Sequence, residues 1–110
     1  MAFDDVLAER VRDVLAPEGG VTEKRMFGGL AFLLDGNMAV GVSGRGGLMV
    51  RVEPDRTEHL VATTTATAME MRDRPVSGWV LVPPEDVAEE AELERWVAVG
   101  VARAGALPPK

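Results

Sequence analysis

An Asp-Gly pair between two apolar runs constrains the fold of this chain more than any other feature. Asp35 and Gly36 separate the run LAFLL at 30–34 from the run MAVGV at 38–42. A two-residue connection between strands needs positive φ angles, which Asp tolerates and Gly adopts freely. The pattern therefore predicts a β-hairpin. The unbroken apolar run at 30–34 is typical of a strand in the interior of a sheet.

The hairpin belongs to a longer antiparallel meander. A short strand is predicted at 23–28, before the hairpin, and the loop SGRGG at 43–47 predicts a second turn after it. The next segment, LMVRV at 48–52, alternates between two faces of a strand. Its Leu48, Val50 and Val52 share one face, and Met49 and Arg51 share the other.

A second group of strands is predicted nearer the C-terminus. One includes Met69 and Met71, and another covers 76–82, where the sequence is VSGWVLV. Between them, Asp73-Arg74-Pro75 has the composition of a turn. Pro83 and Pro84 end the last strand, because proline cannot donate to a sheet.

Helical periodicity surrounds these strands. Residues 3–16 form an amphipathic pattern with Asp4 and Asp5 in its first turn, where the helix dipole favours anions. Pro54 begins a short helical piece at 54–62, and a long helix is predicted from Glu85 onward. The apolar face of this last helix consists of Val87, Ala91, Leu93, Trp96, Val97, Gly100, Val101 and Ala104.

The predicted order is α-β-β-β(-β)-α-β-β-α. Because strands cluster and helices flank them, the fold class is α+β: two layers, an antiparallel sheet with helices on one face. A length of 110 residues predicts one domain, 1–110.

Composition narrows the classes of function. The chain has no cysteine, no apolar run long enough for a membrane span, and an acidic start that is unlike a signal peptide. We therefore expect a cytoplasmic protein without a membrane partner. The formal net charge is −6, which disfavours nucleic acid as a partner, because nucleic-acid binders usually present a basic surface.

Residues that commonly carry catalysis are few. His59 is the single histidine, and Ser43 and Ser77 are the only serines, both in turn contexts. No nucleophile motif or metal-ligand spacing is present. The sequence thus predicts no catalytic residues, no metal, no cofactor and no enzymatic activity.

The segment RMFGG at 25–29 carries the candidate partner surface. Its Gly28-Gly29 pair could cradle an anion, but no helix follows to supply a dipole, so a bulge or tight turn is the preferred interpretation. An arginine beside an aromatic residue is typical of interface hot spots. The six methionines are core fillers or an adaptable surface. The candidate partner-binding residues are Arg25, Phe27, Gly28, Gly29, Arg72 and Arg74.

Five pieces, in this order, resemble the TfoX (Sxy) N-terminal domain family: RMFGGLAFLLDGNMAVGV at 25–42, LMVRV at 48–52, MRDRPVSGW at 71–79, the prolines at 83–84 and LERWV at 93–97. The resemblance covers nearly the whole chain and implies a stand-alone member with a two-layer α+β domain. In the namesake regulators this domain precedes a helical domain, and those proteins act with a cyclic-AMP-receptor-type activator on DNA-uptake genes. The family supplies no catalytic residues to carry over.

The sequence and the resemblance together favour a non-catalytic protein-interaction or regulatory module, with an unidentified protein partner such as a transcription regulator. A homodimer is compatible with this. One alternative is a small-ligand or enzymatic site near Gly28-Gly29. Another is nucleic-acid binding by a local patch, which would consist of Lys24, Arg25, Arg45, Arg51, Arg72 and Arg74.

Overall fold

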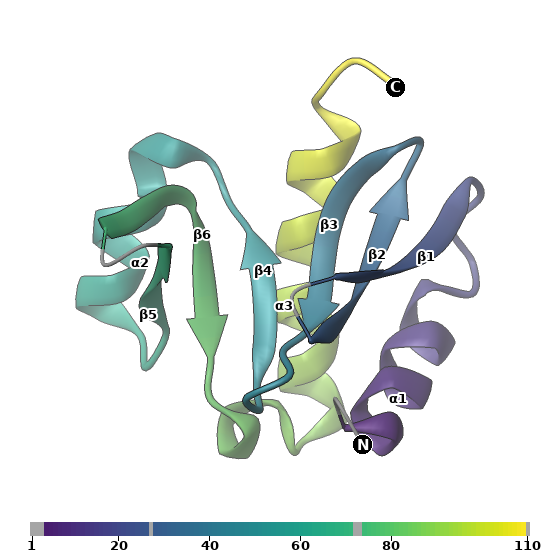
Figure 1. The fold of residues 1–110 in the computed structure, drawn as a ribbon, viewed down its shortest axis with the longest axis horizontal. Helices are drawn as coiled ribbons and strands as arrows, with labels where there is room; N and C mark the ends of the chain where they lie inside the picture. Colours follow the sequence, from purple (N-terminus) through teal and green to yellow (C-terminus); the bar gives the residue numbers. More distant parts are fainter. Residues whose placement is uncertain (1–3, 27, 72–73, 110) are drawn as a thin grey trace.

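The protein folds as a six-stranded antiparallel sheet with its helices packed against it (Figure 1). The computed structural model describes residues 4–26, 28–71 and 74–109, and for residues 70, 71 and 74–76 it describes the backbone only. The elements are α1 (Asp5–Leu15), β1 (Val21–Met26), β2 (Gly29–Leu34), β3 (Asn37–Val42), β4 (Leu48–Arg51), η1 (Pro54–Arg56), α2 (Thr57–Thr63), β5 (Thr67–Met71), β6 (Arg74–Val82), η2 (Pro84–Val87) and α3 (Glu90–Gly105).

The strand order across the sheet is β1-β2-β3-β4-β6-β5. The predicted hairpin is confirmed: Leu34 pairs with Asn37, and Asp35 and Gly36 both have positive φ, 51° and 86°. In the register of β2 with β3, Ala39 is an extra residue, which makes a bulge in β3. The α+β class and the order of elements are as predicted.

The core lies between the sheet and the helices. Alternation on β4 places Leu48 and Val50 in this core and directs Met49 and Arg51 to the opposite side, as predicted. In Figure 1, α3 runs behind β3 and β4, and the other side of the sheet faces the viewer. We call that side the open face.

The first helix begins at Asp5 because Asp4 caps it. The Asp4 carboxylate accepts hydrogen bonds from the backbone N–H groups of Val6 at 3.0 Å and Leu7 at 3.1 Å. An ion pair then joins α1 to the edge strand β1. Arg12 donates from Nε and Nη2 to the two oxygens of Glu23, at 2.7 and 2.8 Å. This hydrogen bonding lowers the pKa of Glu23 and raises that of Arg12.

Two details of the prediction are wrong. Arg74 and Pro75 do not form a turn: they begin β6 and pair with Met71 and Glu70 of β5. Pro75 is tolerated there because β4 pairs with β6 only over 79–82, so the missing N–H is not needed. Asp73, the third residue of the predicted turn, lies outside the described residues.

The last helix begins at Glu90, not at Glu85. A 3₁₀ turn, η2, places Val87 in the core at 1% exposure, and Glu89 is extended before α3 starts. Ala91 is therefore in the first turn of α3 and exposed, although the sequence pattern assigned it to the buried face.

A candidate partner-binding groove between α2 and α3

The partner surface predicted from the sequence comes from two separate parts of the sheet. Arg25 is exposed on the edge strand β1, and Gly28-Gly29 follow it. Arg74 begins β6, which three strands separate from β1. Phe27 and Arg72 lie outside the described residues, as does the side chain of Arg74. The strand order does not bring the two segments together, and their binding role stays a prediction.

The Gly28-Gly29 pair has a clear structural role. Gly28 has φ of +76°, with open space where a Cβ would lie. Gly29 is buried, and a Cβ there would overlap the carbonyl oxygen of Val42 and lie 3.2 Å from the backbone nitrogen of Gly44. The backbone at the start of β2 thus approaches the end of β3 too closely for any side chain. This supports the interpretation of the pair as backbone geometry.

The alternative basic patch is also divided. Lys24 pairs with Ala31, and Arg25 pairs with Leu30, so these neighbours point to opposite faces of β1. Arg51 pairs with Trp79 and lies on the open face, whereas Leu30 belongs to the core cluster on the helix side. Arg25 and Arg51 therefore lie on opposite faces of the sheet, so the whole patch does not form one surface.

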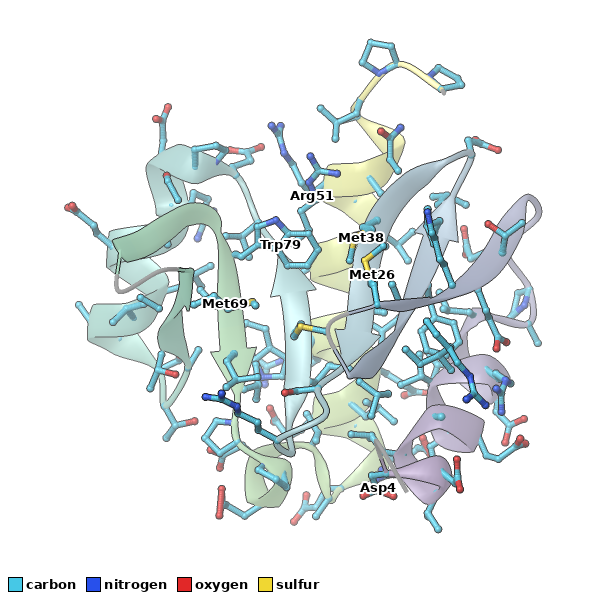
Figure 2. The ribbon with its side chains drawn as sticks, in the orientation of Figure 1. Asp4, Met26, Met38, Arg51, Met69 and Trp79 are labelled. Atoms are coloured by element: carbon cyan, nitrogen blue, oxygen red, sulfur yellow. The ribbon has the colours of Figure 1, made fainter. Side chains whose placement is uncertain are left out.

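The methionines divide between the two roles that the sequence left open. Met49 is only 7% exposed and packs over Gly41, where a Cβ would lie 2.7 Å from its Cε. Met26 and Met38 are half-buried on the open face, together with Trp79 (Figure 2). Met49 thus fills a gap, whereas Met26 and Met38 contribute to a surface.

A groove of about 710 Å³ runs between α2, η2 and α3, on the helix side of the molecule. Its volume is within the range of known ligand-binding clefts. It is assembled from two separate segments of the chain, 60–65 and 85–99. Its lining consists of Leu60, Thr64, Thr65, Glu85, Asp86, Glu89, Glu92, Arg95, Trp96, Ala98 and Val99.

The floor of the groove is apolar. On α3, Leu93 and Val97 are buried against the sheet, and this leaves Trp96 and Val99 at the border of the buried stripe. Leu60 of α2 and Trp96 are half-buried and pack against the core. Val99 is 38% exposed, and it is one of two large apolar side chains with such exposure among the described residues.

Carboxylates surround this floor. Glu85, Asp86, Glu89 and Glu92 line the groove, against one cation, Arg95. Arg95 is occupied in part, because its Nη1 lies 3.1 Å from Glu92 Oε1 in an exposed ion pair. The groove therefore combines an excess of negative charge with apolar contact area.

The acids do not form a metal site, and the residues considered for catalysis remain isolated. Among the described residues, no three His, Cys, Asp or Glu side chains are grouped as metal ligands. His59 is exposed on α2, where its carbonyl oxygen accepts a hydrogen bond from Thr63 at 2.8 Å. Ser77 donates to the carbonyl oxygen of Pro54 at 3.4 Å. In the described part of the chain, no helix is long and apolar enough to cross a membrane.

The profile of the TfoX N-terminal domain family matches residues 13–104. The chain belongs to the TfoX N-terminal domain family. The match runs from the second half of α1 to the last turn of α3, so the whole groove lies inside this TfoX N-terminal domain. Comparison with curated proteins finds no match. The TfoX N-terminal domain family is not a known enzyme family.

Sequence reasoning missed the groove. The sequence pattern placed Trp96 on the apolar face of the last helix, and acids such as those at 85–92 near a helix start are ordinarily attributed to the helix dipole. A usable signal was present: Val99 lies outside the buried stripe of α3, yet it is apolar. A short acidic segment immediately before that helix then places carboxylates beside it.

Proposed function

We propose that this TfoX N-terminal domain is a non-catalytic protein-interaction module with a regulatory role. Its groove between α2 and α3 binds a basic amphipathic segment of a partner protein. The observation that carries the proposal is the acidic rim over an apolar floor. The family match supports a regulatory or competence-related role.

The chemistry of the groove selects the kind of partner. Trp96 and Val99 offer contact area to apolar side chains at helical spacing, as in other helix-in-groove complexes. The carboxylates of Glu85, Glu89 and Glu92 attract Lys and Arg and repel acidic segments. Such complementarity mainly raises association rates and selects partners, and it weakens as salt increases.

A transcription regulator is the class of partner that the family favours, and we place the encounter in the cytoplasm. Two surfaces are candidates for binding this partner: the groove, and the segment 25–29 together with Arg74. The alternative to a different partner protein is a second copy of this chain, which would form a homodimer. The experiment below is designed to separate these.

Site-specific photo-crosslinking tests the proposal directly. A benzophenone amino acid at Val99 reports on the groove, and the same group at Val6 is the matched control. Val6 is the other exposed large apolar residue, at 71%, and it lies on α1, outside the groove lining. Adducts specific to Val99 in the native cytoplasm, mapped by mass spectrometry to a basic segment of one protein, would support the groove.

Charge reversal then tests whether the acidic rim is needed for binding, with the purified basic segment identified by crosslinking as the ligand. Glu89→Lys is expected to weaken binding at least 10-fold, and Arg25→Ala is expected to leave it unchanged. Loss of binding in Arg25→Ala alone would move the site to the segment 25–29. Adducts that are equal at Val6 and Val99, or that join two copies of the domain, would contradict a dedicated partner groove.

A further inference from the structure

Arg51 occupies an unusual position at the end of β4. Its guanidinium carbon lies 5.8 Å from the centroid of the Trp79 ring on the neighbouring strand β6. Figure 2 shows the two side chains together on the open face, with Met38 beside them. Arg51 Nη1 also points at the carbonyl oxygen of Met38, at 3.4 Å, which is a long hydrogen bond.

A second cation, Arg103 of α3, lies at the same end of the sheet. It is about one helical turn after Gly100, which approaches the backbone of Ala39, and Ala39 follows the Met38 carbonyl that Arg51 contacts. Burial lowers the pKa of Arg51, and the positive charge of Arg103, near the end of α3, lowers it further. Arg103 is half-buried, and its Nε is fully buried without a hydrogen-bond partner among the described residues. Among the ion pairs between described residues, none includes Arg51 or Arg103.

This arrangement is unfavourable in the free protein. Two like charges in a partly dehydrated environment repel each other, and a buried donor without an acceptor costs stability. The Trp79 ring stabilises the Arg51 guanidinium by a cation–π contact, but it supplies no acceptor in the plane of the N–H groups. Packing therefore explains the position of Arg51 and leaves the unpaired Nε of Arg103 unexplained.

We propose that Arg51 and Arg103 bind the oxyanion group of a small ligand, a phosphate or a carboxylate. An oxyanion between the two side chains would neutralise both cations and supply the acceptor that Nε of Arg103 lacks. Guanidinium groups suit this task, because their planar N–H donors match two oxygens of one carboxylate or phosphate. The Trp79 ring lies beside the Arg51 guanidinium and contributes no oxygen acceptor that would compete with the ligand.

The site is distinct from the partner groove. Neither Arg51, Arg103 nor Trp79 is among the residues that line the groove. The groove is acidic, whereas this pair is cationic, so a basic partner segment has no reason to occupy it. Failure of one proposal leaves the other intact.

Trp79 provides a direct reporter for the test. The chain has two tryptophans, so Trp96→Phe leaves Trp79 alone beside Arg51. This protein is titrated with sodium phosphate, with sodium acetate, and with KCl at matched ionic strength. We expect saturable fluorescence changes with phosphate or acetate and none with KCl, and whichever salt saturates identifies the oxyanion. The same titrations of the wild-type chain, followed by Tm, remove any dependence on the Trp96→Phe variant.

Three variants decide the result. Arg51→Gln and Arg103→Gln are each expected to weaken the response at least 10-fold. Arg45→Gln, at an exposed loop position, is expected to leave it unchanged. In the absence of oxyanion, Arg103→Gln is expected to keep or raise Tm, because the repulsion with Arg51 and the unpaired Nε donor are both lost. A ligand at ten times its Kd is expected to raise the wild-type Tm by about 6 °C. Equal responses in oxyanion and KCl, or an unchanged response in the Arg51 and Arg103 variants, would overturn the proposal.

Discussion

Replacing Gly100 by alanine is expected to destabilise the domain, although alanine is the better helix former. Gly100 lies on the buried face of α3 against β3. A Cβ there would overlap the carbonyl oxygen of Ala39, and it would lie 2.7 Å from Val40 Cγ1 and 3.0 Å from the carbonyl carbon of Ala39. Ala39 is the extra residue of the bulge in β3, so the obstacle is fixed backbone. To relieve the overlap, the helix itself must move away from the sheet.

The magnitude follows from two opposing effects. Overpacking a well-packed core costs about 1–3 kcal/mol, and contact with backbone places this substitution toward the upper end. Alanine returns about 1 kcal/mol of helix propensity. The net loss in the free energy of unfolding is therefore about 1–2 kcal/mol, and the fall in Tm is about 5–10 °C.

Urea unfolding of both Gly100→Ala and a matched control measures this difference. Gly105→Ala lies in the same helix, where the nearest atom to the new Cβ would be Leu34 Cδ2, at 3.9 Å. It is expected to leave the free energy of unfolding unchanged or slightly raised. The slope of the transition should be the same for both variants. If Gly100→Ala were as stable as Gly105→Ala, the close approach of α3 to β3 would be refuted.

Substitutions at four further positions test the fold. Gly29→Ala is expected to lower the free energy of unfolding by about 2–3 kcal/mol, because the new Cβ overlaps backbone. Gly28→Ala is expected to lower it by about 1 kcal/mol, because only the positive φ is unfavourable there. Urea unfolding measures both. Thr57→Val removes the hydroxyl that accepts from the backbone N–H of Gly78 at 2.9 Å; a loss of about 1–3 kcal/mol is expected, with recovery in Thr57→Ser. Glu23→Gln removes the half-exposed ion pair with α1 and should lower stability by less than about 1 kcal/mol at pH 7. Pairing lowers the pKa of Glu23 in the folded state. This difference should therefore be fully present above pH 4.5, the ordinary pKa of a Glu carboxyl, and be lost as the pH falls through the lower pKa of the folded state.

Local chemistry explains why much of the fold could be predicted from the sequence. Asp35-Gly36 forms its turn because the φ angles that it needs are properties of those two residues. Alternation along 48–51 identifies the buried face of β4, because side chains alternate by covalent geometry alone. In both cases the deciding interactions are a few residues apart.

The predictions were wrong where tertiary contacts, and not neighbouring residues, determine which element forms. Nothing local distinguishes a helix beginning at Glu85 from a 3₁₀ turn followed by a new helix at Glu90. Burial of Val87 in the core selects the second arrangement. Similarly, Arg74 and Pro75 have turn composition, and pairing with β5 places them in a strand. The groove was missed for the same reason, because packing brings α2 to α3 from distant parts of the sequence.

The positions of the charged side chains in the fold change what the net charge implies about binding partners. A net charge of −6 disfavours polyanionic partners when it is treated as a uniform property. In the fold, four carboxylates line one groove on the helix side. By register, the open-face positions of β1–β4 include Lys24 and Arg51 and no acid. Because charges beyond about 10 Å are largely screened in physiological salt, the charge of each surface has little effect at the other. A protein that is acidic overall can therefore offer a basic partner one face and a small oxyanion another.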